Sequence, residues 1–433
     1  MISLIVVLAI VISIALGYKT KINTGFFAIS FAYIIGCFFF RPKDRRNYKH
    51  VAHKNLLCHF CLFRFFYNFA LVNGTLEKLS QALLYRCRKA PKLLPFAIFL
   101  AATLIASLGA GYFTVMASLA PITLLLCEKT GMNKIVGAVS VNYGALAGAN
   151  FMTSASGIIF RGLIEDAGLA DSAFACSTNI FVATMIIPIL VISGLVLFSK
   201  SWNEFGENLE IKEPEPLNHK QRSNLYLIVS MVAIALAAPV LHSIFPDNKV
   251  IAFINSKIDI GLIAIVLSVV ALLLKLADEK EVIAKVPWNT LIMICGVGML
   301  ISVAIKAGTI DILSGWVEAN MPSFLIPIVM CIVAGIMSFF SSTLGVVCPA
   351  LFPIIPSLAA ATGIKAKVLF TCVVIGSQAT SISPFSSGGS LILGSCATEE
   401  DRAEMFPKLM FRAVPMCLAA STVMSIIIST ILG

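Results

Sequence analysis

Twelve long apolar runs determine what this chain can fold into. Each is long enough to span or enter a lipid bilayer, which takes roughly 17–25 residues. Backbone N–H and C=O groups find no partners in lipid, so these runs must be helical. They lack the alternation of polar and apolar residues that marks membrane β-strands. The runs lie at about 2–17, 24–40, 55–73, 94–126, 133–165, 172–198, 223–245, 258–274, 288–306, 322–362, 366–396 and 408–432.

The composition supports this interpretation. Charged residues make up 12% of the 433 residues, whereas soluble domains carry about 25%. A soluble enzyme, a nucleic-acid-binding protein and a secreted disulfide scaffold are therefore excluded. The net charge of +10 is attributed to basic cytoplasmic loops. The 12 cysteines and 5 histidines form no paired zinc motif, so neither a metal site nor a resident cofactor is expected.

Two runs, 94–126 and 322–362, are too long for a single crossing. Small and polar residues interrupt each near its middle, which predicts a re-entrant helical hairpin. The interrupting residues are Ser107, Gly109 and Gly111 in the first run, and Ser341, Ser342, Thr343 and Gly345 in the second.

Two further runs, 133–165 and 366–396, are interrupted at 144–157 and 376–389. Their glycines and Pro384 make a continuous helix unfavourable, so each is predicted to be a broken crossing. The stretch 76–92 has two open interpretations, an amphipathic helix at the membrane interface or a solvated linker.

The chain repeats itself. Residues 21–29 match residues 257–265 at 5 of 9 positions. At a constant shift of 232, polar, proline and glycine positions coincide. The coinciding pairs are Pro121 and Pro353, Thr130 and Thr362, Gly131 and Gly363, Gly144 and Gly376, Ser154 and Ser386, and Gly157 and Gly389.

These observations predict an all-α polytopic membrane protein built from two repeats. Each repeat would hold three crossings, a re-entrant hairpin, a broken helix and a final helix, giving about 10 crossings plus 2 hairpins. Five crossings is an odd number, so the second repeat must be inverted, as in many transporters. The expected boundaries are 1–198 for the first repeat, 199–222 for a cytoplasmic connector and 223–433 for the second.

Basic residues give the orientation. With both termini outside, 19 of the 32 lysines and arginines fall on the cytoplasmic side and 6 on the outer side, as the positive-inside rule requires. This predicts a multi-pass protein of a bacterial-type inner membrane with periplasmic termini.

The remaining basic residues lie in 41–64, which departs from that rule. The segment places His59 and Arg64 in an expected membrane helix, where charge is costly. Three interpretations stay open: an anion-collecting loop, an ordinary tolerated loop, or a short out-of-frame stretch.

The membrane interior carries almost no charge. Arg161, Glu165 and Asp166 lie toward the outer end of a broken helix, and there is no ladder of carboxylates for a proton relay. No Ser/His dyad, Asp pair or HExxH motif lies at bilayer depth, so no catalytic residue is expected and the protein is not interpreted as an enzyme.

Four interruptions gather hydroxyls, amides and bare backbone: 107–113, 148–157, 341–345 and 380–390. Helix N-termini present free N–H groups and partial positive charge, which suits an anion. Adjacent carbonyls and Ser or Asn oxygens can bind Na⁺. The sequence therefore favours a small anionic substrate, with Na⁺ as a candidate coupling ion.

The motifs GANFMTSASG (148–157), SSTLG (341–345) and SPFSSGG (383–389), in this order around two hairpins, resemble the ion transporter superfamily. Within it the chain is most similar to dicarboxylate carriers of the malonate-carrier (MatC) type, which are related to the divalent anion–sodium symporters. The resemblance implies a homodimer, and a transport domain that moves against a scaffold in an elevator-type mechanism.

The symporters carry Ser-Asn-Thr at both hairpin tips. The second tip here is similar, with Ser342 in the Asn position. The first, beginning at Ser107, departs from the pattern, which leaves coupling to Na⁺ or to H⁺ open.

The predicted function is secondary active transport of small dicarboxylates of the malonate, succinate or malate class. Alternatives are a transporter of the same fold for citrate, gluconate or arsenite, a cation/proton antiporter, and a channel or sensor. The candidate substrate-binding residues are Ser342, Thr343, Thr153, Ser154, Ser386, Ser387 and Gly109. The candidate cation-binding residues are Gly148, Asn150, Ser341, Gly345, Ser381 and Pro384.

Overall fold

All regular elements in the described part of the chain are helices, which confirms the predicted all-α class. The computed structural model describes residues 2–20, 22–38, 62, 65–87, 93–198, 215–245, 248–257, 260–286, 288–309, 312, 315 and 320–432. The basic stretch 41–64, apart from Leu62, lies outside the described residues, as does the connector from 199 to 214.

The first repeat contains the predicted hairpin and broken helix. Its turn needs glycine, because Gly109 and Gly111 have φ of +94° and +75°, a region that other residues rarely adopt. The helix after the hairpin begins at Asn133, whose side chain accepts the Ile135 N–H at 2.9 Å. The elements are α1 (Ile2–Thr20), α2 (Thr24–Phe38), a helical stretch at 65–72, α4 (Thr75–Cys87), α5 (Leu94–Ile105), η3 (Ala106–Ala110), α6 (Tyr112–Thr130), α7 (Lys134–Ala149), α8 (Ala155–Asp166), η4 (Ala170–Ser172) and α9 (Ala173–Phe198).

The second repeat follows the same order. Prolines 349, 353 and 356 divide the returning arm of its hairpin into short segments. The elements are α10 (His219–Ile244), α11 (Lys249–Lys257), α12 (Ile260–Leu273), α13 (Glu279–Ala284), α14 (Trp288–Lys306), η6 (Ser323–Leu325), α16 (Ile326–Phe340), η7 (Thr343–Val347), α17 (Cys348–Leu351), η8 (Phe352–Ile354), α18 (Ile355–Thr362), α19 (Ala366–Ala379), α20 (Ser387–Gly394), α21 (Glu399–Lys408), η9 (Leu409–Ala413) and α22 (Val414–Leu432).

Several helices in connecting segments were not expected from the apolar runs. The stretch 76–92, left open above, forms α4 as far as Cys87. The polar helix α21 begins at Thr398, whose hydroxyl accepts the Asp401 N–H, and three acidic residues occupy its first turn. Capping and favourable interaction with the helix dipole explain how so polar a segment becomes helical.

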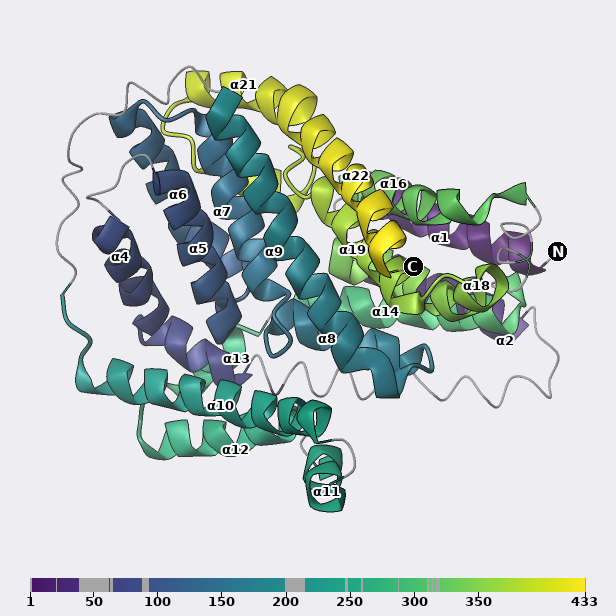
Figure 1. Ribbon diagram of the computed structural model, residues 1–433, viewed down its shortest axis with the longest axis horizontal. Coiled ribbons are helices and arrows are strands. Elements are labelled where there is room, and N and C mark those ends of the chain that lie inside the picture. Colours follow the sequence, from purple (N-terminus) through teal and green to yellow (C-terminus); the bar gives the residue numbers. More distant parts are fainter. Residues whose placement is uncertain are drawn as a thin grey trace.

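The two predicted repeats make equivalent contacts. In Figure 1, the hairpin of α5 and α6 lies on the left, that of α16 and α18 on the right, and the broken helices between them. Gly144 of α7 packs against the Phe99 backbone of α5, and Gly376 of α19 packs against the Cys331 backbone of α16. Both pairs are related by the shift of 232, so each broken helix contacts its hairpin at the same point.

Another contact between hairpin and broken helix has its two residue types exchanged between the repeats. The Thr103 hydroxyl of α5 donates to the Gly144 carbonyl at 3.1 Å, and the broken helix approaches it at Gly148. In the second repeat the hydroxyl belongs to the broken helix, where Thr380 donates to the Gly335 carbonyl of α16 at 2.9 Å. A small residue therefore faces a threonine in both repeats, which permits close helix packing in a membrane.

The third crossing of each repeat packs against the other repeat. Helix α14 crosses α2 where Gly296 and Gly25 meet, with each glycine against the other helix's backbone. At the opposite side, Asn68 in the stretch 65–72 donates to the Val282 carbonyl of α13 at 3.0 Å. Neighbouring Phe69 packs with Ala271 and Val282. The helices preceding each hairpin thus interlock across the repeats.

Helix lengths agree with a membrane protein. In the described residues, four helical stretches are long and apolar enough to cross a bilayer: Tyr112–Thr130, Ala170–Leu197, Thr343–Thr362 and Glu399–Leu432. Seven shorter apolar helices accompany them. The total of about ten crossings stays a prediction, because hairpin arms and half-helices do not each span the bilayer.

The glycine contacts between broken helices and hairpins generate a stability prediction. Gly376→Val places a branched side chain against the Cys331 backbone and should lower the free energy of unfolding by about 1–3 kcal/mol, the usual cost of overpacking. The control is Gly194→Val in α9, where an added Cβ meets nothing within 4 Å. Melting in detergent, followed by size-exclusion fluorescence, measures both; equal melting temperatures would contradict the assigned contact.

Candidate functional site

A buried pair of amides joins the two broken helices. The Asn150 side chain donates to the Gln378 carbonyl oxygen at 2.8 Å, and the Gln378 amide donates back to Asn150 at 3.0 Å. The Asn150 amide also reaches the Thr184 hydroxyl of α9 at 3.2 Å. Asn150 is fully buried and Gln378 is 4% exposed. Since both residues stand where their helices end, the pair holds the two interruptions together.

A second set of hydrogen bonds runs parallel to this pair. The Tyr143 hydroxyl of α7 donates to the Ala379 carbonyl at 2.6 Å. Asn142 donates to the Ser381 hydroxyl at 3.0 Å and accepts from the Tyr112 hydroxyl at 2.6 Å. Tyr112 belongs to the first hairpin, so this chain links that hairpin, the first broken helix and the second interruption.

In the first repeat, the predicted residues lie around the hairpin tip and the start of α8. The Ser154 hydroxyl donates to the Ala106 carbonyl at the tip, at 2.7 Å. Thr153 is fully buried, and its hydroxyl has no hydrogen-bond partner among the described residues. Gly109 packs against the ring of Tyr67, and Gly148 against the Thr103 backbone. The structure therefore brings the first tip and the first interruption into direct contact.

In the second repeat, most predicted hydroxyls make local bonds. Ser341 donates to the Met337 carbonyl at 2.5 Å, and Thr343 is paired with the Ser338 hydroxyl at 3.0 Å. Ser342 accepts the Gly345 N–H at 3.1 Å. These bonds shape the second tip, which packs on Met293 of α14 through Gly345.

The second interruption is organised by Ser386. Its hydroxyl bonds the carbonyls of Ser381 and Ser383 and caps α20 by accepting the Gly389 N–H at 3.4 Å. Ser387 is exposed. The Pro384 carbonyl accepts the Ser390 hydroxyl at 3.3 Å. This interruption has the same close approach as the first, since Gly389 lies on the Ser383 carbonyl as Gly157 lies on that of Phe151.

A cavity of about 630 Å³ opens beside the first hairpin. It reaches Ala155 and Ser156 at the N-terminus of α8 and Leu344 at the second tip. None of the predicted residues lines it, although Gly109, Ser154 and Thr343 are each next to a lining residue. The lining residues are Leu71, Leu76, Glu77, Gln81, Ile105, Ala110, Gly111, Tyr112, Phe113, Thr114, Val115, Ala117, Ser118, Ile122, Ala155, Ser156, Lys285 and Leu344.

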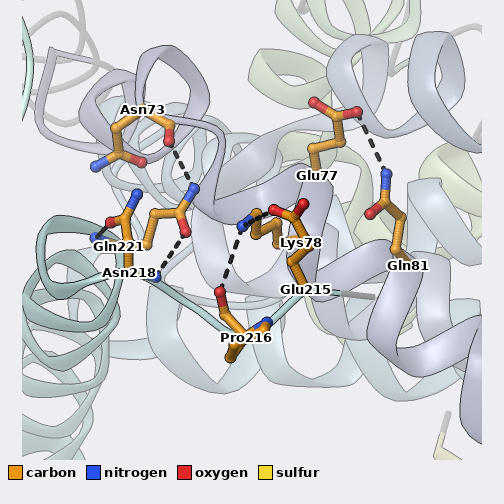
Figure 2. Close-up of polar contacts among 8 residues, drawn as sticks. All are labelled: Asn73, Glu77, Lys78, Gln81, Glu215, Pro216, Asn218 and Gln221. Carbon is orange, nitrogen blue, oxygen red and sulfur yellow. Dashed lines mark hydrogen bonds and ion pairs between the residues drawn. The ribbon is translucent and has the colours of Figure 1, made fainter. Parts of the chain in front are cut away.

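Helix α4 forms one wall of this cavity and is fixed from behind. Figure 2 shows Lys78 turned toward Glu215 and Pro216, at 3.2 and 3.3 Å, while Glu77 and Gln81 interact on another face. Gln221 donates to the Asn73 carbonyl at 3.0 Å and also completes a capping box with Asn218 at the start of α10. These contacts fasten α4 and the turn before it to the end of the connector and the start of α10.

The electrostatics of the cavity favour an anion at its inner end. The N-terminus of α8 faces it through Ala155 and Ser156, and a helix N-terminus carries about half a positive charge. The N-terminus of α20 is separated from it by Tyr112, whose hydroxyl lies against Gly388. No cluster of three His, Cys, Asp or Glu side chains suitable for a metal occurs in the described residues. The N-terminal end of one half-helix, α8, thus borders the cavity.

Several site residues were missed by sequence reasoning. Asn142, Tyr143 and Gln378 are polar residues within apolar helices, a signal that could have drawn attention to them. Tyr112, Thr114 and Ser118 follow the first tip along one helix and line the cavity. Lys285 comes from a connecting segment remote in sequence and carried no such signal.

Comparison with known proteins supports the fold and the class. A family model described as the dicarboxylate carrier protein MatC N-terminus matches residues 1–149. A model of the citrate transporter family matches residues 250–432. No match was found among curated proteins.

Two solved structures share the fold. The YdaH transporter of Alcanivorax borkumensis is 15% identical, with 93% of this chain and 96% of that one covered and a TM-score of 0.59. MtrF of Neisseria gonorrhoeae is 13% identical, with 99% and 96% covered and a TM-score of 0.61.

Fold and site define a multi-pass membrane transporter with paired hairpins and broken helices. Its two family models, over residues 1–149 and 250–432, indicate a transporter of the dicarboxylate or citrate type.

The buried amide pair gives a prediction for stability. Asn150→Leu or Gln378→Leu alone leaves the other amide buried without its partner and should lower the free energy of unfolding by about 1–3 kcal/mol. The double variant should lose less than the sum, because no orphaned amide remains. Thermal melting of the four purified proteins in detergent gives the coupling. Strict additivity would contradict a mutual bond.

Proposed function

We propose that the chain is a secondary active transporter of small dicarboxylates of the malonate, succinate or malate class. The observation that carries this proposal is the cavity beside the first hairpin, which ends at the N-terminus of α8. Apart from Glu77, Gln81 and Lys285, its lining is apolar except for hydroxyl groups, and a helix N-terminus can hold a carboxylate without a buried arginine. The dicarboxylate-carrier model over 1–149 supports this choice of substrate.

Coupling to Na⁺ or H⁺ belongs to the same proposal. Carbonyl and hydroxyl oxygens of Gly148, Asn150, Ser341, Gly345, Ser381 and Pro384 are the candidate cation ligands. Buried Thr153, whose hydroxyl has no partner among the described residues, supports a ligand at the first interruption. The protein would act as a homodimer in the inner membrane with periplasmic termini. Hairpins and broken helices would move together as the transport domain of an elevator-type mechanism.

Citrate is the second candidate substrate. The citrate-transporter model over 250–432 covers the second hairpin and the second broken helix, which form half of the site. A cavity of about 630 Å³ falls within the range of about 300–1,000 Å³ usual for small-molecule sites. Citrate, the larger of these anions, therefore belongs in the same assay.

The deciding experiment is uptake into proteoliposomes. Labelled C3–C5 diacids and citrate are offered while Na⁺ and pH gradients are varied independently. Saturable accumulation of a diacid against its own concentration gradient supports the proposal. The ion gradient that this accumulation requires, of Na⁺ or of H⁺, identifies the coupling ion. Equilibration without accumulation would indicate a channel. Accumulation of citrate and of none of the diacids would identify citrate as the substrate in place of the diacids.

Two candidate hydroxyls make the proposal specific. Neither hydroxyl lines the cavity in this structure, so the proposal has them reach the substrate when the hairpin and the broken helix move. Ser386→Ala combined with Thr343→Ala should then raise the KM for diacid uptake about tenfold, since each lost hydrogen bond contributes about 0.5–1.5 kcal/mol. The control is Ser193→Ala in α9, whose hydroxyl bonds the Ile189 carbonyl of its own helix. Proteoliposome kinetics on variants with matched melting temperatures measure the effect. An unchanged KM in the double variant would remove both residues from the site.

A further inference from the structure

The cavity has a charged mouth as well as a neutral inner end. Of its lining residues two are charged, Glu77 on α4 and Lys285 just after α13, and both side chains are exposed. Glu77 accepts a hydrogen bond from Gln81 at 3.4 Å. The Lys285 ammonium has no ion-pair partner among the described residues. The mouth therefore carries one positive and one negative charge, at separate places and with no ion pair between them in the described residues.

Lys285 is held in place by the packing of α13. Val282, one turn before it, is fully buried with Phe69 and Leu276. The Val282 carbonyl accepts the Asn68 amide at 3.0 Å, and Asp278 caps the start of the helix by accepting the Lys280 and Glu281 N–H groups. The backbone that carries Lys285 is therefore firmly packed. Lys285 and α4 line one side of the cavity, and the first hairpin lines the other.

Hydroxyl groups line the cavity beyond this mouth. Tyr112 and Thr114 in the first turn of α6 and Ser118 one turn later line it, as does Ser156 at the start of α8. The Tyr112 hydroxyl donates to Asn142 and the Ser118 hydroxyl to the Thr114 carbonyl, so Lys285 is the one charged donor among the lining residues. Electrostatic attraction at a partly enclosed mouth raises the local concentration of an oppositely charged ligand.

We propose that Lys285 is a specificity-determining residue, which draws a dicarboxylate into the cavity and holds one of its carboxylates at the mouth. The inference rests on the proposed function and assigns a role to a residue outside the hairpins and broken helices. Glu77 acts in the opposite sense, since its carboxylate repels the same ligand. The pair would therefore favour dianions with one carboxylate directed toward α13.

The test uses full-length protein in detergent, so that the cavity is accessible whatever its orientation in a membrane. Binding of malonate, succinate and citrate is measured by calorimetry for the wild type, Lys285→Gln, Lys285→Arg and Glu77→Gln. The matched control is Lys280→Gln, an exposed lysine of α13 that does not line the cavity. Titrations at about 0.01 M and about 1 M choline chloride compare a Debye length of about 30 Å with one of about 3 Å.

Lys285→Gln should weaken diacid binding three- to tenfold at the lower salt concentration, the order expected for one charge acting through water. The difference should shrink at the higher concentration. Lys285→Arg should retain wild-type affinity, and Glu77→Gln should bind as tightly as the wild type or more tightly. Lys280→Gln should match the wild type, and all melting temperatures should agree.

Two results would overturn the inference while leaving the proposed function intact. One is wild-type affinity in Lys285→Gln. The other is equal weakening by Lys285→Gln and Glu77→Gln, since the sign of the charge would then be irrelevant. If the wild type bound none of the three anions and accumulated none in vesicles, the proposed function would fail together with the inference.

Discussion

Backbone groups released where a membrane helix stops have no partner in lipid, and this constraint explains most of the structure. Each broken helix stops within the protein, packed against the arm of its own hairpin. Glycines at the contact, Gly144 and Gly376, let the backbones approach closely enough to exclude lipid. Serines then bond the freed carbonyls, Ser154 at the first tip and Ser386 within the second interruption. Irregular backbone at this depth is stable because protein encloses it.

The internal symmetry is close at the backbone and weak at the polar side chains. Gly157 and Gly389 pack against backbone carbonyls at equivalent positions, those of Phe151 and Ser383. The amide pair has no such relation, since the position equivalent to Gln378 is Leu146 and that equivalent to Asn150 is Ile382. The asymmetry also leaves one half-helix, α8, facing the cavity while Tyr112 covers the other.

The sequence predicted the skeleton of this fold well. The lengths of the apolar runs and their interruptions predicted both hairpins and both broken helices. The interruptions are rich in glycine, proline and serine because such residues are needed wherever a helix must stop in a membrane, and many of them coincide at the shift of 232. The same residues proved to shape the backbone more than to line the cavity. Ser342 and Thr343 form local bonds at the second tip.

Other features could not be read from the sequence. The cavity wall comes from α4 and Lys285, because hydropathy identifies a crossing but does not say which connecting segments meet. The Asn150–Gln378 bond joins residues 228 positions apart and has no counterpart in the repeat pattern. The short polar helix α21 arises from capping and charge at its first turn, which a search for apolar runs does not register.

The interlocking of third crossings has a consequence for how the protein is made. Helix α2 makes its glycine-to-glycine contact with α14, and about 250 residues separate the two helices in the chain. A ribosome adds about 5–20 residues per second, so α1 and α2 wait in the membrane for the order of ten to fifty seconds before that partner emerges. Through this interval the glycine face of α2 lacks its partner helix, and the translocation machinery, chaperones or lipid must cover it until α14 has been made.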